Sequence, residues 1–251
     1  MRNKFEIKDL NLYYGDYHAL KNINMDLAEN EITAFIGPSG CGKSTIFRLV
    51  NKLLTPAEGT VLVNGTPIEK QKNYCGYMPQ QDLLFPWRTV KENLMLPMEI
   101  QGGISKVEME QRADQALESV GLKDWGKKSP KELSGGMRQR AAFARTVLTG
   151  SDLLLLDEPF SALDYLTRLS MREWLLEQWE REKKTVLFIT HDVEEAVFLS
   201  SRILVVENMP ITHLKSIEVP AEYPRTREEL MRPEIVKLKE DLIDMLRRET
   251  V

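Results

Sequence analysis

The chain has 251 residues, of which 42% are hydrophobic and 29% charged, values typical of a folded globular domain and not of a disordered chain. Lysine and arginine number 34 against 38 aspartates and glutamates, and no long basic run occurs, which argues against nucleic acid as the main partner. The longest apolar runs are too short to cross a bilayer and the first residues lack the apolar stretch of a signal peptide, so we expect any membrane role to act through another chain.

Two strands are predicted at the start of the chain. Their apolar positions are Phe5, Ile7, Leu10 and Leu12 in an edge-like first segment, and Ile23, Met25 and Leu27 in a second segment that alternates with polar residues. Between them, residues 13–17 form a turn rich in tyrosine. A tyrosine ring here could stack on a nucleotide base or pack on the protein's own surface, and its position alone leaves both open.

A glycine-rich loop follows an apolar, β-favouring run at residues 32–36. It consists of Gly37, Pro38, Ser39, Gly40, Cys41, Gly42, Lys43, Ser44 and Thr45. Residues 46–54 then have apolar side chains at helical spacing, so the loop lies between a strand and a helix, as the phosphate-binding pattern G-x-x-x-x-G-K-[ST] requires. The glycines let backbone N–H groups face phosphate oxygens, and the helix adds its unpaired N–H groups and positive dipole end. A chance glycine-rich turn would not have these flanks, and we predict a nucleotide phosphate site.

Two side chains of the loop have defined chemistry. Lys43 would reach the β- and γ-phosphates, and Ser44 would offer its hydroxyl to Mg²⁺. Cys41 lies in the same loop, and its spacing from Cys75, the other cysteine, does not suit a metal. A disulfide would conflict with phosphate binding, so we expect a reducing cytosol.

The next segment combines a strand with an apolar loop. Residues 60–63 read as a strand closed by an Asn-Gly turn. Further on, Gln80 precedes residues 83–87, which are apolar and aromatic. So much apolar surface on a loop predicts a contact surface for a partner, and burial against the domain itself is the alternative.

Residues 89–147 are predicted to be helical, as an insertion into an α/β core. Capping boxes of the form S/T-x-x-E begin at Thr89 and Ser105. The second box opens a helix that ends at a glycine, and its predicted apolar face consists of Val107, Ala113, Leu117 and Val120.

A third helix is predicted to begin at Ser134, which is a favourable N-cap residue. Ser134, Gly135 and Gly136 would leave backbone N–H groups exposed to an anion, and so form a second potential phosphate site. Taken alone, the motif is equally typical of any capped helix with two glycines.

Two carboxylates follow the apolar run at residues 153–156, which suits a parallel strand covered on both faces. Asp157 and Glu158 would lie at the carboxyl end of that strand, where α/β sheets place ligand-binding groups. Asp157 would hold Mg²⁺ through its water shell, and Glu158 would orient or polarise the attacking water. An acidic strand end in solvent is the alternative, and the upstream phosphate loop argues against it.

The remaining elements complete the predicted core. Residues 161–164 form a turn before a long amphipathic helix, whose apolar side chains are Leu166, Leu169, Leu175, Leu176 and Trp179. Residues 185–190 read as a buried strand with His191 at its end, where it would contact a γ-phosphate if this strand lies beside the acidic one. Residues 203–206 are predicted as the last core strand, and residues 234–247 as a helix.

In this order the motifs resemble those of the ATP-binding subunit of ABC transporters, over nearly the whole chain. Tyr14 is similar to the base-stacking aromatic, residues 37–45 to the Walker A loop, Gln80 to the Q-loop glutamine and residues 133–139 to the signature motif. Asp157 and Glu158 resemble Walker B and the catalytic glutamate, Asp164 the D-loop aspartate and His191 the switch histidine. A signature motif between Walker A and Walker B is specific to ABC ATPases. Met137 and Pro79 depart from the common pattern, and neither removes a phosphate ligand through its side chain.

The resemblance implies one ABC ATPase domain over residues 1–251, with a P-loop NTPase (RecA-like) α/β core and an antiparallel β edge. Residues 1–87 and 148–251 would form that core, and residues 88–147 an inserted α-helical subdomain that contains the signature motif. It also implies ATP and Mg²⁺ as cofactors.

Site residues follow from the same resemblance. Glu158, His191 and Gln80 would act in hydrolysis, and Ser44, Gln80 and Asp157 would hold the metal. The nucleotide would be bound by Tyr14, the Walker A loop, Ser134, Gly135, Gly136 and Asp164.

Partners and location are implied as well. Two copies would dock head to tail around ATP on the cytoplasmic face of the membrane, where they would bind transmembrane permease subunits. An extracytoplasmic solute-binding protein would supply the solute to the permease. Residues 84–90 and the pair Pro224-Arg225 resemble the nitrate/sulfonate/taurine importer group, which also includes carriers of bicarbonate and of thiamine-precursor pyrimidines.

Two other functions are compatible with the family. A soluble ABC ATPase of assembly or repair would usually have two cassettes or a long coiled coil, and the sequence has neither. A regulatory subunit that does not hydrolyse ATP would conflict with the intact set of Lys43, Asp157, Glu158 and His191.

Overall fold

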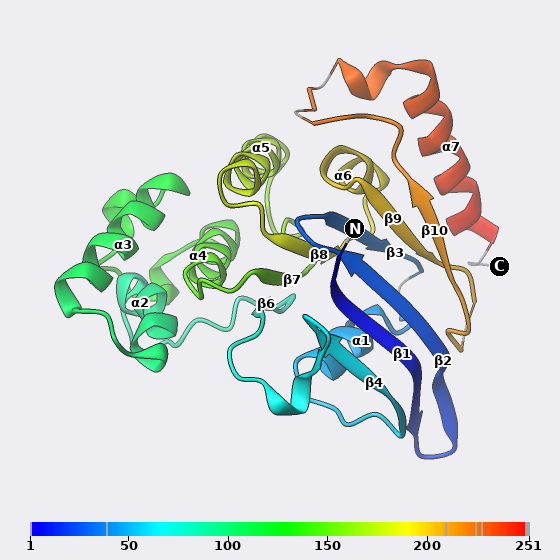
Figure 1. The fold of residues 1–251 in the computed structure, drawn as a ribbon. Helices are drawn as coiled ribbons and strands as arrows, with labels where there is room; N and C mark the ends of the chain where they lie inside the picture. Colours follow the sequence, from blue (N-terminus) through cyan, green and yellow to red (C-terminus); the bar gives the residue numbers. More distant parts are fainter. Residues whose placement is uncertain (1, 39, 209, 224, 227, 249–251) are drawn as a thin grey trace.

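The computed structural model describes residues 2–38, 40–208, 210–223, 225–226 and 228–248. Figure 1 shows a small sheet beside a larger one, helices against the larger sheet, and a group of helices, α2 to α4, that projects to one side. The prediction of an α/β fold with an antiparallel edge is confirmed.

The smaller sheet is antiparallel, with the strand order β2-β1-β4-β5. Its strands are β1 (Asn3–Tyr14), β2 (Tyr17–Ala28), β4 (Glu58–Val63) and β5 (Thr66–Pro67). Leu10 of β1 pairs with Ile23 of β2, and Phe5 of β1 with Val63 of β4, so one apolar face is shared by three strands. The two opening strands and the strand before the Asn-Gly turn are thus confirmed.

The larger sheet has the order β10-β9-β3-β8-β7-β6. Its strands are β3 (Ile32–Ile36), β6 (Gly76–Met78), β7 (Leu153–Asp157), β8 (Thr185–Ile189), β9 (Arg202–Val206) and β10 (Leu214–Glu218). All neighbours run parallel except β10, which is antiparallel to β9. The carboxyl ends of β3, β7 and β8 therefore meet at one edge of the sheet, and the residues that follow them are brought together there.

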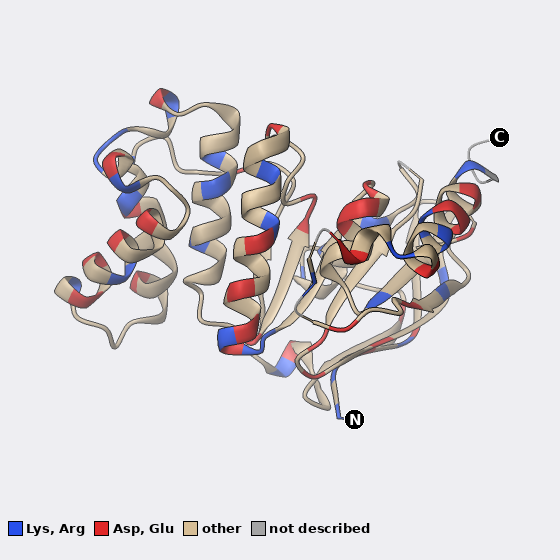
Figure 2. Cartoon of the chain, turned by 90° about the horizontal axis from the view of Figure 1, so that it is seen from above, with Lys and Arg blue, Asp and Glu red and all other residues tan. Residues whose placement is uncertain are grey.

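Helices lie in the regions where the sequence predicts them, and one more, at residues 193–199, was not predicted. They are α1 (Lys43–Val50), α2 (Val90–Gln101), α3 (Lys106–Ser119), α4 (Gly135–Val147), α5 (Tyr165–Glu182), α6 (Val193–Leu199) and α7 (Pro233–Arg248). Short 3-10 turns occur at η1 (Ile68–Lys70), η2 (Lys123–Trp125), η3 (Pro130–Glu132) and η4 (Glu229–Met231). Figure 2 shows lysine and arginine interspersed with aspartate and glutamate along the helices.

The core lies on both faces of the parallel sheet. The uniformly apolar sequence of β7 follows from its position between the two halves of this core. Leu153 and Leu155 belong to a cluster with the smaller sheet and α1, whereas Leu154 and Leu156 belong to a cluster with α2 to α6. Successive side chains of a strand point to opposite faces, so a strand covered on both sides needs apolar residues at every position.

Several sequence predictions are wrong in detail. Leu53 and Leu54 lie beyond the end of α1, and Leu53 is 64% exposed. Val107 and Leu166 are exposed by 65% and 72%, because each lies in the first turn of its helix, before the helix reaches the core. The predicted strand at residues 203–206 is confirmed as β9, but a further edge strand, β10, follows it and was not predicted.

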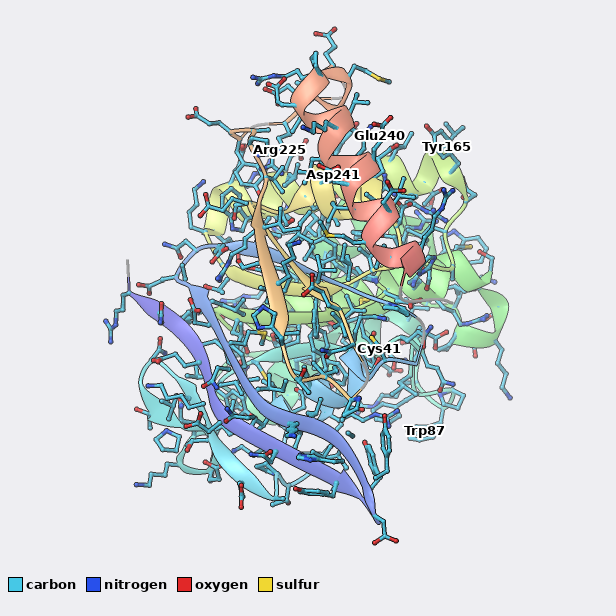
Figure 3. All side chains as sticks on the ribbon, turned by 90° about the vertical axis from the view of Figure 1, so that its right-hand side faces the viewer. Cys41, Trp87, Tyr165, Arg225, Glu240 and Asp241 are labelled. Atoms are coloured by element: carbon cyan, nitrogen blue, oxygen red, sulfur yellow. The ribbon has the colours of Figure 1, made fainter. Side chains whose placement is uncertain are left out.

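The capping boxes also differ from each other. Thr89 and Glu92 make both reciprocal bonds of the box, as predicted. At Ser105 only the serine half is present, with its Oγ accepting from the backbone N–H of Glu108. Of the Pro224-Arg225 pair, Pro224 lies outside the described residues, while Arg225 is buried and donates to the carbonyl oxygens of Val197 and Ser200 at the end of α6 (Figure 3).

Candidate active site

The glycine-rich loop connects β3 to α1 with backbone conformations that only glycine adopts without strain. Gly40 and Gly42 have φ of 79° and 102°, and Gly42 is the N-cap of α1. A Cβ on Gly37 would lie 2.8 Å from Cβ of Val206, so β9 also requires a glycine there. Ser39 of the predicted loop lies outside the described residues. The first N–H groups of α1 are left without helical partners, as in an anion site.

Lys43 turns back over this loop. Its side chain is 8% exposed, and Nζ donates to the carbonyl oxygens of Gly37 at 2.8 Å and Pro38 at 2.7 Å. Cys41, which is buried, lies with Sγ 3.6 Å from Nζ. The ammonium is held by the loop that would surround a phosphate (Cys41 is labelled in Figure 3).

A cavity of about 300 Å³ opens beside the loop. Its lining consists of Gly37, Gly40, Gly42, Lys43, Ser44, Thr45, Arg48, Gln80, Glu158, Ile189 and His191. These residues come from four separate parts of the chain, which the parallel sheet brings to one edge. The structure thus assembles most of the predicted site residues that belong to a single subunit.

Asp157 ends β7 and is 4% exposed. Burial raises the pKa of its carboxyl group, and a hydrogen bond from the Ser44 hydroxyl acts in the opposite direction. A buried carboxylate beside a hydroxyl is an oxygen donor set of the kind that Mg²⁺ prefers, and a bound cation would offset the unfavourable burial of the charge. The residues present therefore fit the metal that the sequence predicts.

Glu158 lies between two other predicted site residues. Gln80 donates from Nε2 to Oε2 of Glu158 at 3.1 Å, and Nδ1 of His191 lies 3.5 Å from Oε1. Asp157 is paired with Ile189 in the sheet, so the strand of His191 does lie beside the acidic strand, as predicted. The backbone of Glu158 has φ of 49°, a left-handed conformation uncommon for a residue with a side chain.

Tyr14, at the end of β1 in the smaller sheet, lies near the glycine-rich loop. It is 44% exposed, and its hydroxyl is 3.5 Å from Oγ1 of Thr45. The neighbouring Tyr13 instead stacks on His18, with ring centroids 4.1 Å apart. Of these two tyrosines, Tyr14 is the one whose position beside the phosphate loop suits a base.

The signature residues lie apart from this cavity in the single chain. Ser134 is exposed at the start of α4 and accepts a hydrogen bond from the N–H of Met137 at 3.3 Å. Asp164 similarly caps α5, accepting from the N–H of Thr167 at 3.1 Å. Hydrogen bonds from the side chain of Thr167 and from this N–H lower the pKa of its carboxyl group. Neither Ser134 nor Asp164 is among the described residues that line the cavity.

Two residues of the site were missed in the sequence. Arg48 lines the cavity one helical turn beyond Ser44, a spacing of four that the sequence could have revealed. Gln139 donates from Nε2 to the carbonyl oxygen of Glu158 at 3.1 Å. Gln139 is the last residue of the predicted signature motif, but no local pattern points to its bond with Glu158, because the two residues are 19 positions apart.

A second concave surface lies between the apolar loop and α2. This groove has a volume of about 690 Å³, and its lining includes Leu83, Phe85, Pro86, Trp87 and Ile100. Trp87, which is labelled in Figure 3, is 74% exposed. Its ring stacks on that of Phe85, with ring centroids 4.9 Å apart. The alternative that the aromatic loop is buried in the domain is therefore wrong for Trp87.

The family model described as ABC transporter matches residues 20–161, more than half of the chain. This chain belongs to the ABC transporter family. Formylaminopyrimidine import ATP-binding protein ThiZ of Halalkalibacterium halodurans is 43% identical over 241 residues, covering 95% of this chain and 94% of ThiZ. Aliphatic sulfonates import ATP-binding protein SsuB of Bacillus cereus is 40% identical over 213 residues, covering 85% of this chain and 83% of SsuB.

Solved structures agree with this assignment. A dimeric ATP-binding cassette, MJ0796, in a post-hydrolysis state bound to ADP and Pi, is 29% identical with a TM-score of 0.78 and covers 87% of this chain and 100% of its own. The chain is accordingly an ATP-binding ABC transporter subunit with an ATPase domain. Among the residues that the structure describes, no helix is both long and apolar enough to span a membrane.

Proposed function

We propose that this ABC subunit hydrolyses ATP to energise a membrane importer for a small anion or organic nutrient of the nitrate/sulfonate/taurine type. The import proteins ThiZ and SsuB, each at least 40% identical to this chain, support the direction and the broad class of solute. The observation that carries the proposal is the carboxylate of Glu158, held between Gln80 and His191 at a cavity that also contains Lys43.

ATP would bind along the glycine-rich loop. The N–H groups of residues 37–45 would surround the phosphates, and Lys43 would exchange its two loop carbonyl partners for β- and γ-phosphate oxygens. Tyr14 would stack on the base from beside Thr45. Arg48 would add positive charge on the same side of the cavity.

Ser44, Asp157 and Gln80 would hold Mg²⁺ with the nucleotide. Their hydroxyl, carboxylate and amide oxygens are the donors expected for this ion. Bound there, the ion would neutralise charge on the phosphates as the γ-phosphoryl group is transferred. Asp157 would contribute a carboxylate that burial otherwise disfavours.

Glu158 would orient the attacking water and accept its proton during in-line attack on the γ-phosphate. His191 would contact the γ-phosphate from the end of β8, and Gln80 would align the carboxylate through the hydrogen bond to Oε2. Both neighbours of the carboxylate would thereby respond to whether a γ-phosphate is present.

The site would be completed by a second copy of the chain. Ser134, Gly135 and Gly136 are at the exposed start of α4, so in a head-to-tail dimer they would face the ATP of the partner. Asp164, at the start of α5, would lie at the same interface. Hydrolysis would remove the γ-phosphate contacts between subunits and let the dimer open.

We further propose that the groove around Trp87 receives a helix of the transmembrane permease, on the cytoplasmic face of the membrane. An exposed apolar groove of this size is the kind of surface that binds an amphipathic helix. Residues 88–147 would form the helical subdomain, which contains the signature motif and lines part of this groove, and residues 1–87 and 148–251 would form the core. An extracytoplasmic binding protein would deliver the solute to the permease.

A transport assay tests the proposal. The subunit is co-purified with its permease, reconstituted in vesicles that contain ATP and Mg²⁺, and offered labelled sulfonates, nitrate, taurine or pyrimidines from outside together with the binding protein. ATP-dependent uptake that stops with Lys43→Ala would support it. ATP hydrolysis without uptake of any offered solute would contradict the proposed solute class, and the absence of a permease complex would contradict the membrane role.

A further inference from the structure

Gln139 is a buried polar residue on α4, five positions beyond the cap residue Ser134 and 4% exposed. A buried amide must find hydrogen-bond partners on both its ends. Its Nε2 donates to the carbonyl oxygen of Glu158 at 3.1 Å and to Oγ of Ser161 at 3.3 Å, and its Oε1 accepts from the N–H of Ala162 at 2.9 Å. The side chain thus joins α4 to the loop that follows β7.

The partner at the centre of these bonds is the strained backbone of Glu158. Its φ of 49° persists only where the surroundings fix it. The N–H of Glu158 donates to the carbonyl oxygen of Ile189 at 3.0 Å, and its own carbonyl oxygen accepts from Gln139 and, at 3.1 Å, from Oγ of Ser161. The peptide groups on the two sides of Cα are therefore held, one by the neighbouring strand and one by α4.

The start of α4 also approaches this loop closely. A Cβ on Gly136 would lie 3.3 Å from the carbonyl oxygen of Ala162 and 3.3 Å from Cδ2 of Leu163. The helix and the loop have no space between them for independent movement at this point. A shift of α4 would consequently be transmitted to the turn of Glu158, through both packing and the amide of Gln139.

We propose that Gln139 is a positioning residue for hydrolysis, which ties the backbone turn of Glu158 to the helix that begins at Ser134. The inference rests on the proposed role of Glu158 in activating water. Its consequence is a link between two sites: in a head-to-tail dimer, the helix that presents Ser134 to the partner's ATP also sets the carboxylate that acts on the chain's own ATP.

The test uses Gln139→Leu and Gln139→Met, two apolar replacements of similar size that remove the bonds to Glu158 and Ala162. Steady-state hydrolysis by the full chain should show kcat reduced by about 10- to 100-fold, since displacement of a catalytic group by about 1 Å can cost ~10²-fold. The Kd of a fluorescent ATP analogue should stay within about twofold of the wild-type value, because the phosphate loop is untouched. Thr146→Val removes a buried hydroxyl that donates to the carbonyl oxygen of Ala142 within α4, and as the matched control it should keep kcat.

A double-mutant cycle separates positioning from a general loss of structure. Ser161→Ala removes the other side chain that donates to the carbonyl oxygen of Glu158, so its effect on kcat and that of Gln139→Leu should be non-additive. An additive cycle, or kcat within about twofold of wild type in both folded Gln139 variants, would overturn the inference. So would a loss of kcat matched by an equal loss of ATP-analogue affinity. Glu158→Gln is assayed in parallel, and normal turnover in that variant would refute the underlying role of Glu158 instead.

Discussion

Truncation of Trp87 distinguishes a docking residue from a packing residue. The side chain is 74% exposed, and its ring stacks on that of Phe85, with ring centroids 4.9 Å apart. Loss of such a ring pair costs about 0.5–1.5 kcal/mol, whereas removal of a buried tryptophan would cost about 3–5 kcal/mol. One kcal/mol corresponds to roughly 2–4 °C of melting temperature at this chain length, so Trp87→Ala should melt no more than about 6 °C below wild type.

Binding to the permease should respond far more strongly. An aromatic anchor in a groove contributes about 2 kcal/mol or more, which is roughly a 30-fold increase in Kd on truncation. The assay measures the affinity of detergent-solubilised permease for immobilised Trp87→Ala, together with the melting temperature and basal ATPase activity of the same preparation. Met231→Ala, which removes a side chain that is 75% exposed outside the groove, is the control and should change neither affinity nor melting temperature. A Trp87→Ala subunit that melts well over 10 °C lower and still binds the permease with unchanged affinity would refute the docking role.

Three further substitutions test separate parts of the structure. Ser134→Arg should retain ATP binding by the monomer but fail to form the ATP-dependent dimer in a Glu158→Gln background, and light scattering that detects an unchanged dimer would contradict the composite site. Arg172→Leu leaves the buried carboxylate of Glu195, 2.9 Å from the guanidinium, without that partner, and should lower the free energy of unfolding in urea by about 3 kcal/mol; a loss below 1 kcal/mol would show the ion pair to be dispensable. Asp157 has a pKa raised by burial, so the native state binds its proton at higher pH than the unfolded chain does, and this group's contribution to stability declines as pH rises through the raised pKa. Asp157→Asn should therefore raise the melting temperature of the nucleotide-free protein at pH 7, while impairing Mg²⁺-dependent hydrolysis. A lower melting temperature would contradict the conclusion that the charged carboxylate of Asp157 destabilises the nucleotide-free protein.

Much of the site was predictable because its residues lie at the ends of elements that the sequence marks clearly. The loop before Lys43 follows an apolar strand, and Asp157 and Glu158 follow a run of four leucines. Parallel pairing then places their side chains at one edge, and the pairing of Asp157 with Ile189 brings His191 to the same place. The type of each residue and its position at a strand end were enough to predict the assembly.

The remaining features depend on contacts that local patterns do not contain. Strand β10 (Leu214–Glu218) was missed because its burial is only partial, as expected for a short strand at the edge of a sheet. Val107 and Leu166 match the apolar spacing of their helices but lie in the first turns, beyond the reach of the core. The left-handed turn at Glu158 and its bond from Gln139 arise from tertiary packing, which a single sequence does not reveal.

The central claim is that this ATPase subunit activates water through Glu158, and phosphate release tests it most directly. Full-length wild type and Glu158→Gln are compared at saturating ATP and Mg²⁺, and binding of ATP to each is measured in the same buffer. The amide keeps the size of the side chain but cannot accept the proton, so turnover should fall by ~10²-fold or more while ATP binding is retained. Phosphate release by Glu158→Gln at the wild-type rate would contradict the account.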